Sequence, residues 1–160
     1  MSDERAIAKT VYETVCSTLD GEGWKYDRHD EDLVITCGAR GDDLPMDIVI
    51  MVNQKAQVIS LFSVLPFKIN EKARVDAAIA VSVANYNMVN GCFDYDISDG
   101  DIRFRMVSSY RDSLIGAELI KYMIYCSAST VDKYNDKFLM LSNGIWDIKA
   151  FLEWTQKEEN

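Results

Sequence analysis

The stretch MDIVIMVNQKAQVISLFSV, residues 46–64, contains two strands and the turn that joins them. Residues 46–53 and 57–64 are rich in β-branched and large apolar side chains, and NQKA between them is typical of a tight turn. Strands joined by so short a connection pair antiparallel, because a parallel pair needs a long crossover. The stretch therefore predicts a β-hairpin and an antiparallel sheet.

The same hairpin predicts that both faces of the sheet are apolar. With the turn at residues 54–55, Val52 faces Gln57, and one face holds only aliphatic side chains (Ile48, Ile50, Ile59 and Leu61) for helices to cover. A solvent-exposed face of a sheet should instead carry polar side chains. The opposite face pairs Met51 with Val58, Val49 with Ser60, and Asp47 with Phe62, so it is largely apolar. Contiguous apolar patches mark interfaces, so the candidate partner-binding or dimer face is Val49, Met51, Val58 and Phe62.

A second hairpin is predicted around Asp99–Gly100, a strong two-residue turn signal between residues 92–98 and 101–107. In this register Asp96 faces Arg103 and Asp94 faces Arg105, while the other face is wholly apolar. Arginine partners keep aspartates ionised. We therefore interpret these charges as structural pairs and not as proton-transfer groups.

Helical periodicity is found in four segments. The spacing predicts helices over residues 3–19 and 71–90, with Asn70 as the N-cap of the second and Gly91 at its end. A long helix is predicted over residues 115–141 and an amphipathic segment after residue 144. Apolar residues share one face of the first helix (Ile7, Val11, Val15, Leu19) and one face of the second (Val75, Ile79, Val83, Tyr86).

The predicted element order is α-β-β-β-α-β-β-α, with residues 33–37 as the first strand and residues 24–27 as a further candidate strand. Hairpins and flanking helices of this kind predict an α+β domain, an antiparallel sheet packed against helices. We expect one domain over residues 1–144 and a helical extension over residues 145–160. Asn85 and Asn87 lie two positions apart and cannot share a helix face, so an amide-lined pocket is not expected.

Composition excludes several functions. The net charge of −9 argues against broad nucleic-acid binding and against docking on anionic membranes, since both need a cationic surface. A nucleic-acid-binding module that uses Arg103, Arg105 and Arg111 is an alternative, and the net charge argues against it. No apolar run approaches the roughly 20 residues that span a bilayer, and the acidic N-terminus does not resemble a signal peptide. We expect a cytoplasmic protein.

No catalytic, metal or cofactor site is predicted. Cys16, Cys37, Cys92 and Cys126 lie in apolar segments with no C-x-x-C pair, and His29 is the only histidine, so free thiols are expected. The alternative is a small-molecule-binding protein or enzyme with a pocket between sheet and helices, lined by tyrosines (Tyr86, Tyr110, Tyr122, Tyr125 and Tyr134).

Several motifs, in order, resemble the YbjN-like family of bacterial proteins, which shares the fold of type III secretion chaperones. They are GEGWKYD (21–27), VLPFKINEKARVD (64–76), ANYNMVNGCFDYDISDGDIRFR (84–105) and SNG (142–144). The resemblance covers about residues 5–144 and implies helices on one face of the sheet, frequent homodimers and no catalytic residues. The family is labelled as sensory-transduction regulators, and the related chaperones are small, acidic dimers that hold other polypeptides.

The resemblance implies a non-catalytic, protein-binding or regulatory bacterial protein, chaperone-like in fold. We expect a homodimer, another polypeptide, or the segment around Trp146, Phe151 and Trp154 to cover the candidate face.

Overall fold

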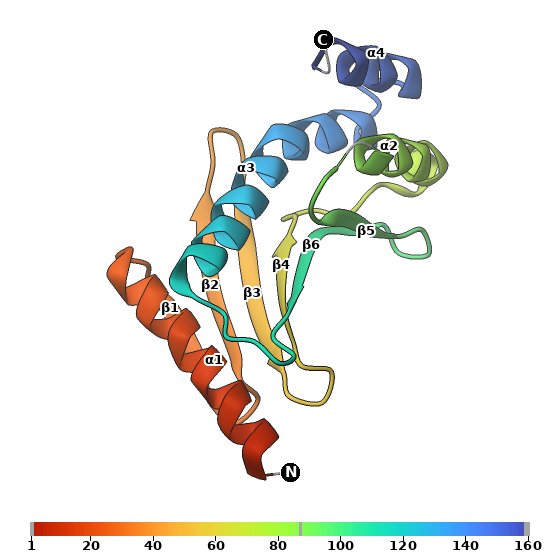
Figure 1. Ribbon diagram of the computed structural model, residues 1–160. Helices are drawn as coiled ribbons and strands as arrows, with labels where there is room; N and C mark the ends of the chain where they lie inside the picture. Colours follow the sequence, from red (N-terminus) through yellow and green to blue (C-terminus); the bar gives the residue numbers. More distant parts are fainter. Residues whose placement is uncertain (1, 87, 159–160) are drawn as a thin grey trace.

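A computed structural model describes residues 2–86 and 88–158. Within these residues the chain forms one six-stranded antiparallel sheet, ordered β1-β2-β3-β4-β6-β5, and four α-helices (Figure 1). The strands are β1 (Tyr26–His29), β2 (Val34–Arg40), β3 (Pro45–Asn53), β4 (Val58–Val64), β5 (Cys92–Asp96) and β6 (Asp101–Ser109). The helices are α1 (Ser2–Gly21), η1 (Glu71–Ala73, a 3-10 turn), α2 (Arg74–Tyr86), α3 (Ala117–Ser142) and α4 (Ile148–Glu158).

The predicted α+β class is confirmed, but the predicted order omitted one strand. β1, a short edge strand at the candidate segment after the first helix, makes four strands between α1 and α2 instead of three.

The helices that touch the sheet lie on one face of it (Figure 1). The inward side chains of β3 and β4 alternate along the strands and are almost completely buried (Ile48, Ile50, Val52, Ile59 and Leu61). α3 crosses this face and contributes a buried stripe that includes Ile120, Ile124, Val131 and Phe138. This single layer of helices covers only the inner face.

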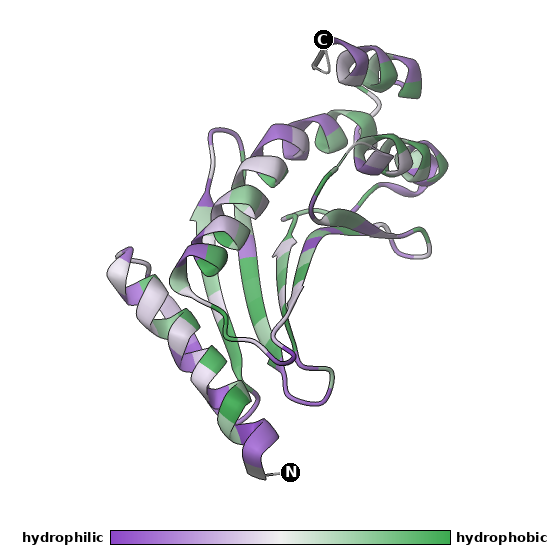
Figure 2. Ribbon diagram, in the orientation of Figure 1, coloured by the Kyte–Doolittle hydropathy of each residue, from purple (hydrophilic) through white to green (hydrophobic). Residues whose placement is uncertain are grey.

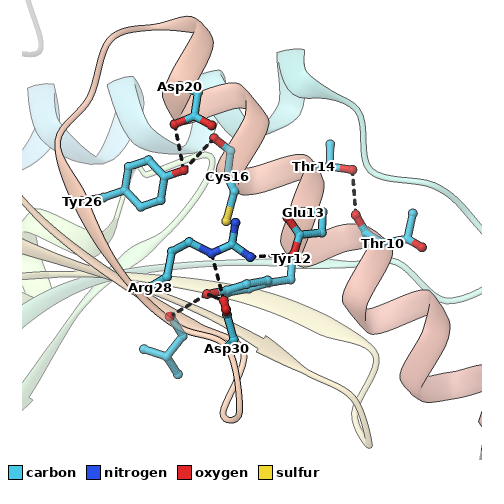
Figure 3. A network of polar contacts seen from close by, with 10 residues as sticks. Thr10, Tyr12, Glu13, Thr14, Cys16, Asp20, Tyr26, Arg28 and Asp30 are labelled. Carbon is cyan, nitrogen blue, oxygen red and sulfur yellow. Dashed lines mark hydrogen bonds and ion pairs between the residues drawn. The ribbon is translucent and has the colours of Figure 1, made fainter.

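A polar network fastens α1 to the β1 edge of the sheet (Figure 3). The Tyr12 hydroxyl donates to the Asp30 carboxylate at 2.9 Å, and Arg28 donates to the same carboxylate at 2.9 Å and to Glu13 at 2.6 Å. Burial and the bond to Asp30 raise the pKa of Tyr12 to about 12. Arg28 and Tyr12 hold the pKa of Asp30 below its usual value, so the carboxylate stays ionised as the acceptor of this network.

Both predicted hairpin registers are wrong by two residues. Asn53, not Val52, is the last paired residue of β3 and faces Val58, and Asp94 faces Arg103 while Asp96 faces Asp101. The pairings predicted for the outer face are therefore also wrong, because Val49 faces Phe62, Met51 faces Ser60 and Asp47 faces Val64.

Four-residue loops cause this shift. In loops 30–33, 54–57 and 97–100 the fourth residue has a positive φ, with values of 55°, 55° and 83° at Leu33, Gln57 and Gly100. The residue before two of the loops stabilises the longer turn with its side chain: Asn53 accepts the Ala56 N–H and Asp96 accepts the Ser98 N–H, each at 2.8 Å. Because side chains alternate with a period of two, a two-residue shift leaves every side chain on its predicted face.

The predicted second helix is divided and shorter than expected. Asn70 does not cap it; its side-chain NH₂ donates instead to the Ser142 carbonyl at 2.9 Å and so ties the start of η1 to the end of α3. α2 packs through small residues (Ala77, Ala80, Val81 and Ala84). The apolar stripe recognised in the sequence lies on the other side of α2, where Val75 and Tyr86 are 66% and 85% exposed.

Candidate functional site

The outer face of the sheet is open. In Figure 1 the described helices lie on the other side of the sheet. The centre of β3 is coloured hydrophobic in Figure 2, which means that apolar residues there point to both faces of the sheet. The four predicted residues share this outer face. We define the open face as these four residues together with two that the register adds: Val34, Val49, Met51, Val58, Phe62 and Val107.

The register brings these side chains into contact range across the strands. Val34 faces Met51, and Val49 faces Phe62. Met51 and Val107 are 42% and 48% exposed, and the other four are half-buried. Sequence reasoning missed Val107 because nothing local shows that β6 pairs with β4, and it missed Val34 because the register of β2 against β3 was not predicted. The alternation of apolar and polar residues within each strand was the available signal.

An arginine ridge, which we define as Arg103, Arg105 and Asp94, borders the open face on β5 and β6. Arg105 donates two hydrogen bonds of 2.8 and 3.0 Å to the Asp94 carboxylate, and Nε of Arg103 lies 3.5 Å from the same carboxylate. The Arg103 guanidinium also lies over the Phe62 ring, 4.5 Å from its centroid. Partial burial opposes ionisation of Asp94, but the two arginines outweigh it and lower the pKa of the carboxyl. The ridge therefore holds two guanidinium groups against one carboxylate.

The predicted pairing of Asp96 with Arg103 does not occur. Asp96 faces Asp101, and its carboxylate accepts hydrogen bonds from the backbone and the hydroxyl of Ser98. Asp96 therefore holds the loop, whereas Asp94 pairs with the two arginines of the ridge.

An acidic hollow borders the open face on the opposite side, over β1, β2 and β3. Its outer-face lining includes Lys25, Asp27, Thr36, Gly38, Asp47 and Val49. Within the described chain, neither Asp27 nor Asp47 takes part in an ion pair. A Cβ added to Gly38 would have the Met46 carbonyl oxygen, 3.9 Å away, as its nearest neighbour, so the missing side chain leaves space in the hollow.

The C-terminal segment does not cover the open face, so one of the three alternatives that we gave for its covering is wrong. Phe151 is fully buried, 5.4 Å from Phe138 between ring centroids, and Trp154 meets Tyr134 at 5.1 Å. Both partners belong to α3. The segment is therefore packed on the helical side of the molecule.

The tyrosines do not line one pocket. Tyr110 is buried and donates to the Asn53 carbonyl, while the hydroxyls of Tyr122 and Tyr125 bond to Asn90 and Glu22. Tyr134 packs edge-on against Phe93, with 5.5 Å between the ring centroids, and Tyr86 is exposed. The five tyrosines therefore do not form the shared pocket that the alternative function required.

The remaining candidates have structural settings. Asn85 bonds both backbone groups of Phe93, and Asn87 lies outside the described residues. The four cysteines are free, and His29 lies 3.4 Å from the Thr36 hydroxyl. In residues 2–86 and 88–158 no three or more His, Cys, Asp or Glu side chains converge on a metal site, and no helix there is long and apolar enough to cross a membrane.

Comparison with known proteins identifies the relatives of the chain. The YbjN family model, described as "Putative bacterial sensory transduction regulator", matches residues 12–140. The crystal structure of YbjN from E. coli, "a putative transcription regulator", superposes with a TM-score of 0.58 at 12% identity and covers 78% of this chain and 87% of that one. A chain of the ExsC–ExsE complex superposes with a TM-score of 0.57 at 9% identity, covering 81% and 94%. No curated protein matches the sequence. The structural matches confirm the predicted type III secretion chaperone-like fold.

Proposed function

This chain belongs to the YbjN family of bacterial regulators, and we propose that it acts without catalysis, by binding a polypeptide on the open face of its sheet. The observation that carries the proposal is an apolar centre with a charged border on a face that no described helix covers. Depletion of charge at the centre and a polar rim are the anatomy of protein–protein interfaces.

The family and fold agree with this function. The family is described as a regulator of sensory transduction, and one similar structure is that of a complex, ExsC with ExsE. Because the four cysteines are free thiols, a reducing compartment suits the protein, and we place it in the bacterial cytoplasm.

The test is capture of binding polypeptides from a bacterial extract by wild type and by a Met51→Glu, Phe62→Glu double variant, read by mass spectrometry. Two carboxylates in the apolar centre should abolish capture, since burying charged groups against a partner is costly. A Val75→Glu, Ile79→Glu double variant is the matched control, because it makes the same charge change on the exposed stripe of α2.

We expect the α2 variant to retain the polypeptides that the open-face variant loses. Equal capture by wild type and the open-face variant, with both folded by circular dichroism, would contradict the proposed function.

A further inference from the structure

The two borders of the open face carry opposite charges, and we propose that the face binds one amphipathic helix of another polypeptide. This helix lies across the strands, with basic side chains over the acidic hollow at one end and acidic side chains over the arginine ridge at the other. The inference rests on the proposed function, since it takes the open face as the binding surface and names the kind of polypeptide segment that binds there.

The register of the strands aligns the charges in rows that run across the sheet. One row consists of residues that each lie directly opposite the next, namely Asp27, Thr36, Val49, Phe62 and Arg105. Directly opposed residues of antiparallel strands point to the same face of the sheet. The row therefore has a carboxylate at one end, a guanidinium at the other and apolar side chains between them.

The neighbouring row repeats the same order of charges. Asp47 lies opposite Val64, and Val64 lies opposite Arg103. Both rows therefore begin with a carboxylate on the side of β1, β2 and β3 and end with an arginine on β6. A bound segment that runs along the rows meets negative charge at one end and positive charge at the other.

Each border has an excess of one sign of charge. The hollow holds the carboxylates of Asp27 and Asp47 and the ammonium of Lys25, and within the described chain neither carboxylate forms an ion pair. The ridge holds two guanidinium groups and one carboxylate. Complementary charges at an interface fix the partner and its register, so the partner should be basic over the hollow and acidic over the ridge.

The apolar centre favours a helix over an extended segment. An extended segment laid on Val49, Met51 and Phe62 would take its backbone N–H and C=O groups out of water, and these side chains offer no hydrogen bonds in return. A helix satisfies its backbone groups internally. α3 already covers the inner face of the same sheet in this way, with contacts to β4 and β6.

The dimensions of the face fit a helix of ordinary length. Four strand spacings separate β1 from β6, so Asp27 and Arg105 are about 19 Å apart across the sheet. An α-helix covers that distance with about 13 residues. Its diameter of about 10 Å exceeds the separation of the two rows, which is about 7 Å. One helix therefore reaches the charges of both rows at each border.

The test measures the binding of synthetic peptides to the intact 160-residue chain by fluorescence anisotropy. Each peptide has about 18 residues, an apolar face of leucine and alanine, and blocked termini without charge. The segregated peptide carries glutamates at its N-terminal end and lysines at its C-terminal end, an order that suits the helix dipole. The interspersed peptide has the same composition with its charges in pairs four residues apart, which stabilise a free helix.

We expect the segregated peptide to bind at least about tenfold more tightly than the interspersed one, which corresponds to 1.4 kcal/mol. Circular dichroism of the free peptides checks that the interspersed peptide is no less helical. A proline at the centre of the segregated peptide breaks the helix and leaves the charges unchanged. This peptide should also bind at least about tenfold more weakly, because its apolar face is no longer continuous.

A variant of the hollow should reverse the preference. Asp27→Lys, Asp47→Lys makes the hollow basic, so a third peptide with glutamates at both ends should bind this variant more tightly than the segregated peptide does. Both aspartates are exposed, so the fold should be unchanged, as circular dichroism checks. Glu4→Lys, Glu71→Lys is the matched control, because it makes the same charge change at exposed residues of α1 and η1 and should keep the order of wild type.

Four results would overturn the proposal. They are a segregated peptide that does not bind wild type or binds no better than the interspersed one, a proline peptide that binds as well as the segregated one, and a hollow variant that keeps the order of wild type. The fourth is a wild type that sediments as a dimer while Met51→Glu, Phe62→Glu sediments as a folded monomer, since a second copy would then cover the face.

Failure of this inference and failure of the proposed function are distinguishable. If the peptides show no preference but Met51→Glu, Phe62→Glu still loses the polypeptides captured from the extract, the open face binds polypeptides of another kind and the proposed function survives. If that variant keeps its captured polypeptides, the proposed function itself fails.

Discussion

Gly100 shows how one residue fixes the position of a whole hairpin. Its φ is +83°, and an added Cβ would lie 2.3 Å from the Ile69 carbonyl oxygen. The Ile69 N–H donates to the Gly100 carbonyl at 2.8 Å, so the β5–β6 loop is docked on the chain just before η1. The glycine is therefore required both by the turn and by the close approach of two backbones.

We expect Gly100→Ala to lower the free energy of unfolding by at least about 3 kcal/mol, because a positive φ and a backbone clash act together. Gly144→Ala is the matched control. Gly144 has a φ of +70° but open space around it. Its substitution should lower the free energy of unfolding by about 1–2 kcal/mol, which is the cost of the left-handed conformation alone. Urea unfolding of both variants measures the difference, and equal costs would show that the contact with Ile69 is not tight.

Asp94 makes stability depend on pH. Its pKa in the folded protein lies below its ordinary value of 3.8, so its contribution is complete above the unfolded pKa and is lost as pH falls through the folded pKa. We expect Asp94→Asn to cost about 1 kcal/mol at pH 7 and nothing at a pH below the folded pKa, since the pair is partly exposed. Thermal unfolding of both proteins from pH 7 to pH 2.5 measures this. An unchanged gap between wild type and variant across that range would contradict the ion-pair account.

At the scale of elements, β5 is an edge strand whose free side is capped by a side chain. Asn85 of α2 donates to the Phe93 carbonyl at 3.0 Å and accepts its N–H at 2.7 Å. These are backbone groups that another strand would otherwise pair with. One asparagine thus ties α2 to β5 and closes the edge.

Asn85→Ala should therefore lower the free energy of unfolding by about 1–3 kcal/mol and increase concentration-dependent association. Asn90→Ala removes only an exposed bond to the Tyr122 hydroxyl and should cost less than about 0.5 kcal/mol. Chemical denaturation and sedimentation distinguish the two variants. Indistinguishable behaviour would mean that the edge of β5 is protected by something other than Asn85.

α4 lies beyond the part of the chain that matches the family, and we propose that residues 1–144 fold without it. It covers Tyr134 and Phe138 at the end of α3 with Phe151 and Trp154. A protein that ends at Gly144 should lose only the helical signal of α4 from its circular dichroism spectrum and keep cooperative unfolding. It should melt at a lower temperature, because aromatic surface becomes exposed. A truncated protein that does not fold would show that the domain includes α4.

Sequence reasoning predicted the faces of the strands better than their partners. Successive side chains along β3 and β4 alternate between the two faces, so the sequence predicts which of them point to the open face. A two-residue error in register does not change the face on which a side chain lies. The register itself was missed because Asn53 and Asp96 extend their loops with side-chain hydrogen bonds, which compete with the expected two-residue turns. The ridge and the hollow could not be predicted, since both depend on pairings between strands distant in sequence.

At the scale of the whole molecule, one layer of helices on one sheet leaves apolar side chains exposed among residues 2–86 and 88–158. They include the open face and the stripe on α2 with Val75, Ile79 and Tyr86. The open face is bordered by charges of both signs, and these charges lie on neighbouring strands of the same sheet. For this reason we take the open face as the functional surface.

The measurement that tests this most directly is photo-crosslinking in living bacteria from a benzoyl-phenylalanine at position 51, with position 17 on α1 as the control. Met51 lies at the centre of the open face, whereas Ser17 is an exposed polar residue on α1. We predict that position 51 gives a discrete cross-linked product with a polypeptide, either a second copy or another chain, and that position 17 does not. No product from position 51 above the level of position 17, with both proteins folded and equally abundant, would contradict the account.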